Sequence, residues 1–235
     1  MIELDALVLS VGEPQLERCL TAVRNQKIPF KNIIHMENVI PENEANNRGL
    51  QLVKSEWVAK IDGDIVLYPN ATDTMISHME KYNGDRISSY HFGLYDPFIR
   101  YIIGATSVFR TELFKARKQP DKLGGSGGGR IVNQLMREGW ETKRFTRRRV
   151  VVGVHFDKPD EFQVFRRYYC DGARANDNGF NIRRMTKFYE ETHDPLYLLA
   201  LEAIKFAKSK NRAYIGSRNI EYDRKLFEEF KALRQ

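Results

Sequence analysis

Two carboxylates separated by one glycine are the residues of this sequence best suited to chemistry. Asp62-Gly63-Asp64 directly follows an apolar segment, residues 56–61, that predicts a buried strand. With a glycine between them, both carboxylates can approach one hard cation, and Mg²⁺ or Mn²⁺ prefers such oxygen ligands and readily bridges to phosphates. The same three residues are also typical of a simple turn between strands, so the motif alone leaves both interpretations open.

The segments on either side of this motif predict an α/β domain. The expected strands cover residues 6–11, 32–36, 56–61, 65–67, 86–94, 101–110 and 150–155. The expected helices, in which apolar residues recur every three to four positions, cover residues 15–26, 43–54, 70–82, 111–117 and 131–138. Strands and helices that alternate at this spacing predict a parallel sheet with helices on its faces, and such sheets bind ligands at the carboxyl ends of their strands.

The character of the chain changes near residue 160. Helical spacing follows at residues 162–169, 182–191, 196–209 and 222–233. We therefore expect two parts, a catalytic domain over residues 1–160 and a basic helical extension over residues 161–235. In this extension, the run Arg166-Arg167-Tyr168-Tyr169 suits contact with a sugar acceptor, a lipid headgroup or nucleic acid bases, and equally suits packing of an appended helix.

Composition places the chain among globular proteins with an anionic partner. It has 235 residues, of which 42% are hydrophobic, and a formal net charge of +7. The only cysteines, Cys19 and Cys170, lack zinc-binding spacing. There is no apolar run near the roughly 18 residues of a spanning helix, and residues 1–14 do not resemble a signal peptide. We expect a cytoplasmic protein, and the sequence leaves open peripheral membrane contact and homodimer formation.

Several motifs resemble, in order and spacing, the GT-A glycosyltransferases of family 2. The resemblance covers about residues 5–157. It is carried by the opening strand 7–11 with Leu16, Cys19, Leu20 and Gln26, by Asn46-Asn47-Arg48-Gly49-Leu50, by Lys54 to Val58 and Ile61 to Asp64, by Gly104 to Phe114, and by Leu135, Gly139, Trp140 and the strand 150–154 with His155.

The resemblance implies a GT-A fold, which is a Rossmann-like mixed sheet flanked by helices, and transfer of a sugar from a nucleotide-diphosphate donor of the UDP or GDP type. The acceptor would be a hydroxyl of a glycan or another molecule, in surface glycan or polysaccharide synthesis, and the cofactor would be Mn²⁺ or Mg²⁺. The donor-binding positions it implies are Ser10, Gly12, Glu13, Glu37, Asn38, Asn47, Arg48, Asp62 and Gly63. The implied metal ligands are Asp62, Asp64 and His155, with Asp157 as a fallback, although a histidine at the end of a buried strand is also a common structural residue.

The sequence departs from the family at the catalytic base. Inverting members carry an acidic residue at a position that falls near Gly127 and Gly128, within the glycine-rich stretch Gly124–Gly129. Such a stretch behaves as flexible coil, and it also resembles a designed linker that replaces a natural segment. Either Asp121 or Asp96 supplies the base that deprotonates the acceptor, or the natural loop was replaced, or the enzyme does not invert.

Two other classes of protein fit the basic composition less well once motifs are considered. A nucleotidyltransferase on a similar sheet would carry a basic, glycine-rich loop after the first strand, and residues 11–14 contain no basic residue. A basic nucleic-acid-binding module would show a recognition motif, which we do not find, so we expect no nucleic acid partner. The basic residues Lys143, Arg144 and Arg147 to Arg149 suit either a diphosphate, an anionic acceptor or a charged strand edge.

Overall fold

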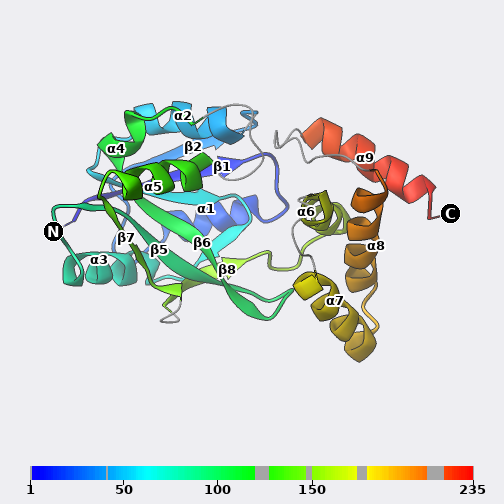
Figure 1. The fold of residues 1–235 in the computed structure, drawn as a ribbon. Coiled ribbons are helices and arrows are strands. Elements are labelled where there is room, and N and C mark those ends of the chain that lie inside the picture. The colour runs from blue at the N-terminus through cyan, green and yellow to red at the C-terminus, as the bar shows by residue number, and fades with distance from the viewer. Residues whose placement is uncertain are drawn as a thin grey trace. The chain divides into compact units, whose positions relative to one another are not determined.

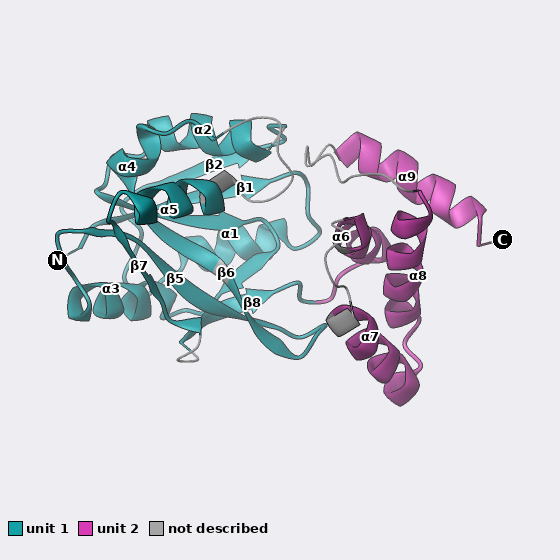
Figure 2. Ribbon diagram, viewed as in Figure 1, with its two compact units in different colours: residues 1–121, 125–157 teal, residues 122–124, 158–235 magenta. Residues whose placement is uncertain are grey.

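A mixed β-sheet organises the first two thirds of the chain in the computed structural model (Figure 1). The structure describes residues 2–40, 42–119, 127–146, 150–173, 179–210 and 220–234. The chain divides into two compact units (Figure 2). Unit 1 comprises residues 1–121 and 125–157, and unit 2 comprises residues 122–124 and 158–235.

Unit 1 contains all the strands of the described residues. These are β1 (Leu4–Ser10), β2 (Ile33–Glu37), β3 (Trp57–Asp62), β4 (Ile65–Leu67), β5 (Ile87–Asp96), β6 (Tyr101–Arg110), β7 (Glu141–Arg144) and β8 (Val151–His155). Its helices are α1 (Leu16–Arg24), α2 (Glu42–Leu52), α3 (Ala71–Lys81), α4 (Thr111–Lys115) and α5 (Gly127–Arg137). The element order therefore begins as alternating strands and helices, as the sequence predicts.

The sheet is mixed, with parallel pairs among β1, β2 and β3 and again where β5 meets β7 and β8. The strand order is β2-β1-β3-β6-β5-β8-β4, and β7 pairs beside β5. β1 pairs in parallel with β2 and β3, whereas β6 is antiparallel to both β3 and β5. The parallel pairing that strand and helix spacing predicts is therefore confirmed for β1, β2 and β3, and the antiparallel pairs of β6 agree with the mixed sheet of the GT-A fold. Only four residues join β5 to β6, too few for a crossover, so these two strands form an antiparallel hairpin, whereas the pairing of β6 with β3 is a long-range contact.

Helices cover both faces of this sheet, and two apolar clusters fill the space between the layers (Figure 1). On β1, Leu4, Ala6 and Val8 face the cluster that includes α1 and α3. The alternate residues Leu7 and Leu9 face the cluster beneath α2, α4 and α5. This alternation follows from the period of two in a strand, and burial on both faces explains why β1 is apolar throughout except at Asp5 and Ser10.

The glycine-rich stretch differs from its expected form. We expected coil as far as Gly129 and a helix from Ile131, but helix α5 begins at Gly127. Ile131, Val132 and Leu135 are buried in the cluster beneath the helix. Their burial stabilises the whole amphipathic segment, because tertiary packing rather than glycine's low helix propensity decides whether its first turn forms.

Unit 2 consists of four helices within the described residues. They are α6 (Glu161–Ala173), α7 (Gly179–Thr192), α8 (Pro195–Ser209) and α9 (Ile220–Ala232). Phe165 on α6 contacts the rings of Phe206, Phe227 and Phe230, which forms an aromatic core between α6, α8 and α9. Across the part of the chain that the structure describes, every helix is too short or too polar to cross a bilayer.

The basic and aromatic run on α6 takes part in this packing. Tyr168 and Tyr169 are buried, and Arg166 donates from Nε to Asp223 Oδ2 on α9 at 2.7 Å. These contacts favour the packing interpretation of the run over contact with an external ligand. The four helices thus have a core of their own, as an independent unit requires.

A buried carboxylate ties the start of β1 to two neighbouring segments. Asp5 is fully buried and accepts hydrogen bonds from Asn32 Nδ2 (2.9 Å), from the Lys54 and Ser55 backbone N–H groups (2.8 and 3.1 Å) and from Ser55 Oγ (2.7 Å). Burial acts to raise the pKa of Asp5, but these hydrogen bonds outweigh it, so the pKa lies below its usual value. Asp5 therefore holds together the entries into β2 and β3, the two parallel neighbours of β1.

Replacing Asp5 tests this interpretation. Asp5→Asn should lower the free energy of unfolding by about 2–4 kcal/mol at neutral pH, because buried donors lose a charged acceptor. A carboxylate with a lowered pKa stabilises fully above its unfolded pKa and progressively less as the pH falls through its folded pKa. Urea denaturation should therefore show the difference from wild type shrinking in acid. The exposed Glu3→Gln serves as the matched control and should change stability by less than about 1 kcal/mol.

Candidate functional site

The carboxyl ends of β1 and β3 bring the predicted donor-binding loop and the Asp62-Gly63-Asp64 turn together. Leu9 on β1 pairs with Asp62 on β3, and the Gly63 N–H donates to the Leu9 carbonyl at 2.8 Å. The loop that follows β1 therefore lies beside the turn that follows β3. This is the edge at which open α/β sheets bind ligands.

The loop after β1 approaches Gly63 closely through its side chains. A Cβ on Gly63 would lie 2.6 Å from Glu13 Oε2 and 3.0 Å from the Ser10 Cβ. Glu13 Oε2 is itself held in place by the Val11 backbone N–H at 2.9 Å. The structure therefore adds a third carboxylate, that of Glu13, to the two that flank the glycine.

A lysine that sequence reasoning missed binds the first of these carboxylates. Lys60 Nζ lies 3.2 Å from Asp62 Oδ1 and 2.7 Å from Glu42 Oε1, which comes from α2. Lys60 and Asp62 are two residues apart on β3, so their side chains leave the same face of the strand. This spacing of two residues is the feature of the sequence from which the ion pair between Lys60 and Asp62 could have been predicted. Lys60 holds the Asp62 carboxylate toward the α2 side of the sheet and offsets part of its charge.

The second carboxylate lies beside His155. Ile65 pairs with His155 across the antiparallel strands β4 and β8, which brings the ring next to Asp64. His155 Nε2 lies 3.4 Å from Asp64 Oδ2, and Nδ1 lies 3.2 Å from Asp96 Oδ2 at the end of β5. The structure therefore brings His155 to the motif residue that the sequence predicted as its co-ligand.

The negative potential of this edge acts on Cys19. Burial raises the pKa of the Cys19 thiol to about 12, and the charges of Asp64, Asp62 and Glu13 add to that rise. All three carboxylates are therefore close enough to act on one buried group. Such like charges repel in a medium of low polarisability, and a cation bound between them would relieve that repulsion.

The donor set fits a divalent cation that is shared with a phosphate group. Asp62 and Asp64 supply oxygen donors, and His155 supplies a nitrogen donor. Within the described residues no three His, Cys, Asp or Glu side chains are arranged as a complete metal cluster. Mg²⁺ does not need such a cluster, because it is commonly held by one or two carboxylates with substrate phosphates and water completing its shell.

The residues predicted to hold the base and ribose lie at the neighbouring strand end. Ser10 Oγ and His35 Nε2 are 2.7 Å apart, and the Asn38 N–H donates to the Ser10 carbonyl at 2.9 Å. Glu37 and Asn38 are exposed where β2 ends, and Asn38 adopts a positive φ of 55°. Gly12 also has a positive φ, 82°, and nothing lies within 4 Å of where its Cβ would be, so the loop after β1 presents bare backbone.

Two predicted donor-binding residues on α2 are engaged elsewhere. Asn47 exchanges hydrogen bonds with the backbone of Gln119, donating from Nδ2 at 3.0 Å and accepting at Oδ1 at 2.9 Å. Arg48 donates from Nε to Glu44 Oε1 at 2.6 Å, and its side chain is 63% exposed. The structure gives Asn47 the task of holding the chain just before residue 120, and it does not bring Arg48 to the carboxylates.

The structure describes one of the two residues predicted as the catalytic base, Asp96, and not the other, Asp121. Asp121 lies outside the described residues, as do residues 147–149 of the basic cluster. Asp96 is fully buried, with Oδ1 accepting from the Ile99 N–H at 3.1 Å and Oδ2 beside His155. A base must reach the acceptor hydroxyl, so this position does not suit Asp96 for that task. Gly127 and Gly128, at the family's usual position, form the first turn of α5.

The fallback ligand Asp157 is paired with a cation of the protein itself. Arg18 Nη2 lies 2.8 Å from Asp157 Oδ2, and Gln15 Nε2 donates to the Asp157 carbonyl at 2.9 Å. These contacts fix the chain directly after β8 against α1. Of the basic cluster, Lys143 forms an ion pair with Glu141 on the same strand, β7.

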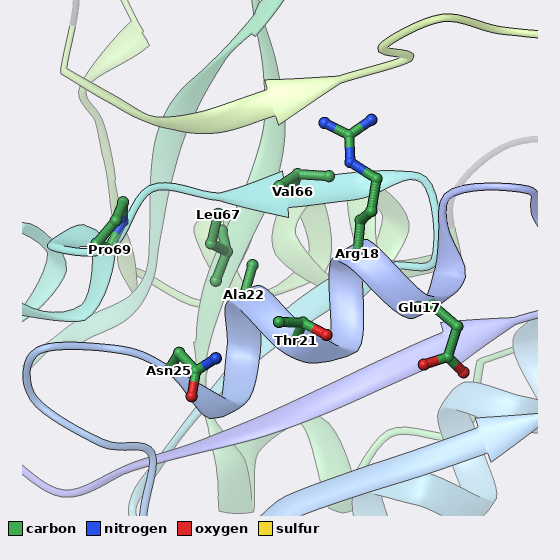
Figure 3. Close-up of a pocket in the computed structure, with 8 residues that line it drawn as sticks. All are labelled: Glu17, Arg18, Thr21, Ala22, Asn25, Val66, Leu67 and Pro69. Carbon is green, nitrogen blue, oxygen red and sulfur yellow. The ribbon is translucent and has the colours of Figure 1, made fainter.

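A shallow groove of about 420 Å³ lies apart from these carboxylates, between α1 and the edge strand β4 (Figure 3). It is lined by Glu17, Arg18, Thr21, Ala22, Asn25, Val66, Leu67 and Pro69. None of the predicted donor or metal residues lines it. The groove therefore does not form part of the candidate site.

The solved structures that are similar to the chain include two with a TM-score above 0.5. The mannosyltransferase PcManGT from Pyrobaculum calidifontis, in complex with GDP-Man and Mn²⁺, is 12% identical, with 98% of this chain and 80% of that one covered and a TM-score of 0.56. TarS residues 1–349 from S. aureus, in complex with UDP-GlcNAc, is 10% identical, with 88% and 81% covered and a TM-score of 0.52. No protein-family model and no curated protein matches the sequence. At these identities the likeness shows the fold, and the predicted GT-A fold is confirmed.

The close approach at Gly63 can be tested without a ligand. Gly63→Ala should lower the free energy of unfolding by about 1–3 kcal/mol, because its methyl group overlaps Glu13 and crowds Ser10. Glu13→Ala should recover part of that loss when the two changes are combined, which urea denaturation of the double-mutant cycle measures. Gly84→Ala is the control, since its Cβ would meet Ile87 only at an ordinary 3.6 Å. Additive effects at residues 63 and 13 would contradict the contact.

Proposed function

We propose that the chain is a divalent-cation-dependent glycosyltransferase, related to family 2, that moves a hexose or similar sugar from a nucleotide-diphosphate donor to a hydroxyl acceptor. One observation carries the proposal. Asp62 and Asp64 flank Gly63 at the carboxyl edge of β1 and β3 in a GT-A fold, Glu13 contacts Gly63, and His155 lies beside Asp64. A cluster of carboxylates repels a diphosphate unless a cation lies between them, so this arrangement suits a donor that arrives with Mn²⁺ or Mg²⁺.

In this proposal the chain's own residues hold the cation and the donor. Asp64 is the main ligand, Asp62 the second, and His155 Nε2 completes the protein's share. Lys60 keeps Asp62 in place through its two ion pairs. When bound, the cation neutralises the charge that develops on the nucleotide diphosphate as it leaves.

The loop after β1 and the end of β2 would hold the nucleoside. Bare backbone at Gly12 permits close approach of the donor, and Ser10, paired with His35, fixes the start of the loop. Glu37 and Asn38 are exposed at the adjacent strand end, where carboxylate and amide groups can bind ribose hydroxyls or a base edge. Asn47 supports the site indirectly by holding Gln119, and Arg48 stays a candidate contact to the diphosphate.

Fewer residues support the part of the proposal that concerns the acceptor. Asp121 is our candidate for the base that takes the proton from the acceptor hydroxyl. The surplus of 15 basic over 10 acidic residues in segment 166–235 suits an acidic glycan or an anionic membrane surface near the acceptor. We propose a role in surface glycan or polysaccharide synthesis on this basis. PcManGT and TarS were solved with guanine and uracil nucleotide sugars respectively, so GDP and UDP donors are the first to test.

A nucleotide panel identifies the donor. Thermal-shift measurements with UDP, GDP, CMP and dTDP sugars, each with and without Mn²⁺, should show cation-dependent stabilisation by one nucleotide, because a ligand that binds only the folded state raises Tm. Absence of a response to every nucleotide, together with tight binding of RNA or DNA, would reject the enzyme and favour a nucleic-acid-binding module.

A single substitution tests the metal assignment. Asp64→Ala should reduce the cation-dependent affinity for the stabilising nucleotide by more than about 100-fold in calorimetric titration. That loss is larger than the roughly 10–100-fold caused by mutating residues that only hydrogen-bond to a metal ligand. Asp85→Asn is the control, since Asp85 is an exposed carboxylate that precedes β5 at the strand end opposite Asp96. Equal nucleotide affinity for wild type and Asp64→Ala in Mn²⁺ would show that the cation is held elsewhere.

A further inference from the structure

We infer that a line of polar side chains across the sheet binds an acceptor sugar that carries an acid group. This inference rests on the proposed function and names the class of its acceptor. The line, which we call the polar row, consists of Lys60 on β3, Ser107 on β6, His91 on β5 and Arg144 on β7. Each residue pairs with the next across neighbouring strands. Paired residues lie on the same face of a sheet, so the four side chains leave one face side by side.

The polar row begins where the apolar layer beneath α5 ends. In the neighbouring row, Val58 on β3 pairs with Phe109 on β6, and both are buried in the cluster that includes α5. In the polar row, Ser107 and His91 are half-buried and Arg144 is exposed. The change from apolar to polar falls on the side of the sheet where β3 ends, which is also the side of the candidate cation site. A ligand on that side can therefore reach the polar row.

The middle of the row is suited to sugar hydroxyls. Ser107 Oγ lies 2.7 Å from His91 Nδ1, and Ser89 Oγ lies 3.3 Å from Nε2 of the same ring. A hydroxyl offers one donor and two acceptor positions, so Ser107 retains hydrogen-bonding capacity for a ligand while it contacts the ring. Burial lowers the pKa of His91 to about 4, and the charge of Arg144 contributes to that fall. The imidazole is therefore neutral at neutral pH, and the middle of the row carries no charge.

The far end of the row is suited to an anion. Arg144 is exposed, and among the described residues no carboxylate lies within ion-pair distance of its guanidinium group. Its neighbour Lys143, by contrast, forms an ion pair with Glu141. A guanidinium group matches the geometry of a carboxylate or a phosphate and binds either one through two parallel hydrogen bonds. Arg144 therefore offers an acid group of the ligand a charge that no described carboxylate neutralises.

The spacing of the row relates its two ends to the transferase reaction. Lys60 Nζ lies 3.2 Å from Asp62 Oδ1, so this end adjoins the candidate cation site and the donor diphosphate that we propose there. Neighbouring strands lie about 4.8 Å apart, which puts the backbone of Arg144 about 10 Å from that of Ser107. One sugar ring with an acidic substituent spans such a distance. The acceptor hydroxyl would then lie at Ser107, near the donor, and the acid group at Arg144.

Three small probes test the polar row. Glucose 6-phosphate, glucuronic acid and methyl glucoside carry a phosphate, a carboxylate and no charge respectively. Each is titrated by NMR into isotope-labelled wild type with Mg²⁺ and the nucleotide that stabilises the protein. We expect the two acids to bind at least about 10-fold more tightly than methyl glucoside and to shift the ring signals of His91, because a hydrogen bond to a charged group is the stronger one. The tighter of the two acids identifies phosphate or carboxylate as the preferred group.

Substitutions locate the site on the row. Arg144→Gln should lower the affinity for the tighter acid by about 10–100-fold and leave the affinity for methyl glucoside unchanged, because only the charge-assisted contact is lost. Ser107→Ala should weaken the binding of all three probes. Lys143→Gln is the matched control, since it removes a positive charge from the adjacent position of β7, whose side chain leaves the opposite face of the strand. It should change none of the affinities.

The outcomes keep the two proposals apart. Equal losses in Arg144→Gln and Lys143→Gln would mean that the general charge of the edge strand attracts the acids, and they overturn the inference. Equal binding of methyl glucoside and the acids overturns it as well, as does no binding of any probe, and these wild-type results hold even if a variant does not fold. Each result leaves the transferase proposal standing if the nucleotide panel is positive. Without cation-dependent binding of any nucleotide the transferase proposal fails, and titration of the sugars alone still tests the row.

Discussion

Repulsion among carboxylates at one sheet edge is the constraint on which the rest of the site depends. The pairing of β1 with β3 places the loop after one strand against the turn after the other, and Gly63 lets Glu13 approach within contact distance. The backbone thus fixes the charges before any ligand arrives. Holding like charges together costs stability, and the structure offsets part of that cost with Lys60 beside Asp62.

A second glycine, Gly153 on β8, also shapes this edge of the sheet. A Cβ on Gly153 would lie 2.6 Å from the Val66 carbonyl and 3.0 Å from the Leu67 Cα, so only glycine lets β4 pair this closely with β8. That pairing brings His155 to Asp64. The approach of the Glu13 and Ser10 side chains to Gly63 and the approach of the β4 backbone to Gly153 therefore decide which side chains meet. The site depends on residues without side chains as much as on the carboxylates themselves.

Local patterns predicted the elements of unit 1 well, because alternating apolar runs and three-to-four-residue spacing reflect local burial. The Asp62-Gly63-Asp64 motif and His155 were also accessible to sequence reasoning, since both follow apolar strands. Three features were not. The antiparallel placement of β6 is a matter of topology, the helical start at Gly127 depends on tertiary packing, and the buried contact of Asp96 with His155 joins residues 59 positions apart. Each is decided by long-range pairing that no local spacing encodes.

The charge of the whole chain and the charge of the site have opposite signs, and the two act over different distances. A net charge of +7 attracts an anionic nucleotide from solution, with a range set by the Debye length of about 8–10 Å. Within the site the nearest charges are carboxylates, so the attraction reverses at contact. A diphosphate can therefore be drawn to this protein without binding tightly to it. For the nucleotide-diphosphate donor that we propose, tight binding would require a cation that satisfies the carboxylates and the phosphates together, so the proposed cation dependence is consistent with this arrangement of charges.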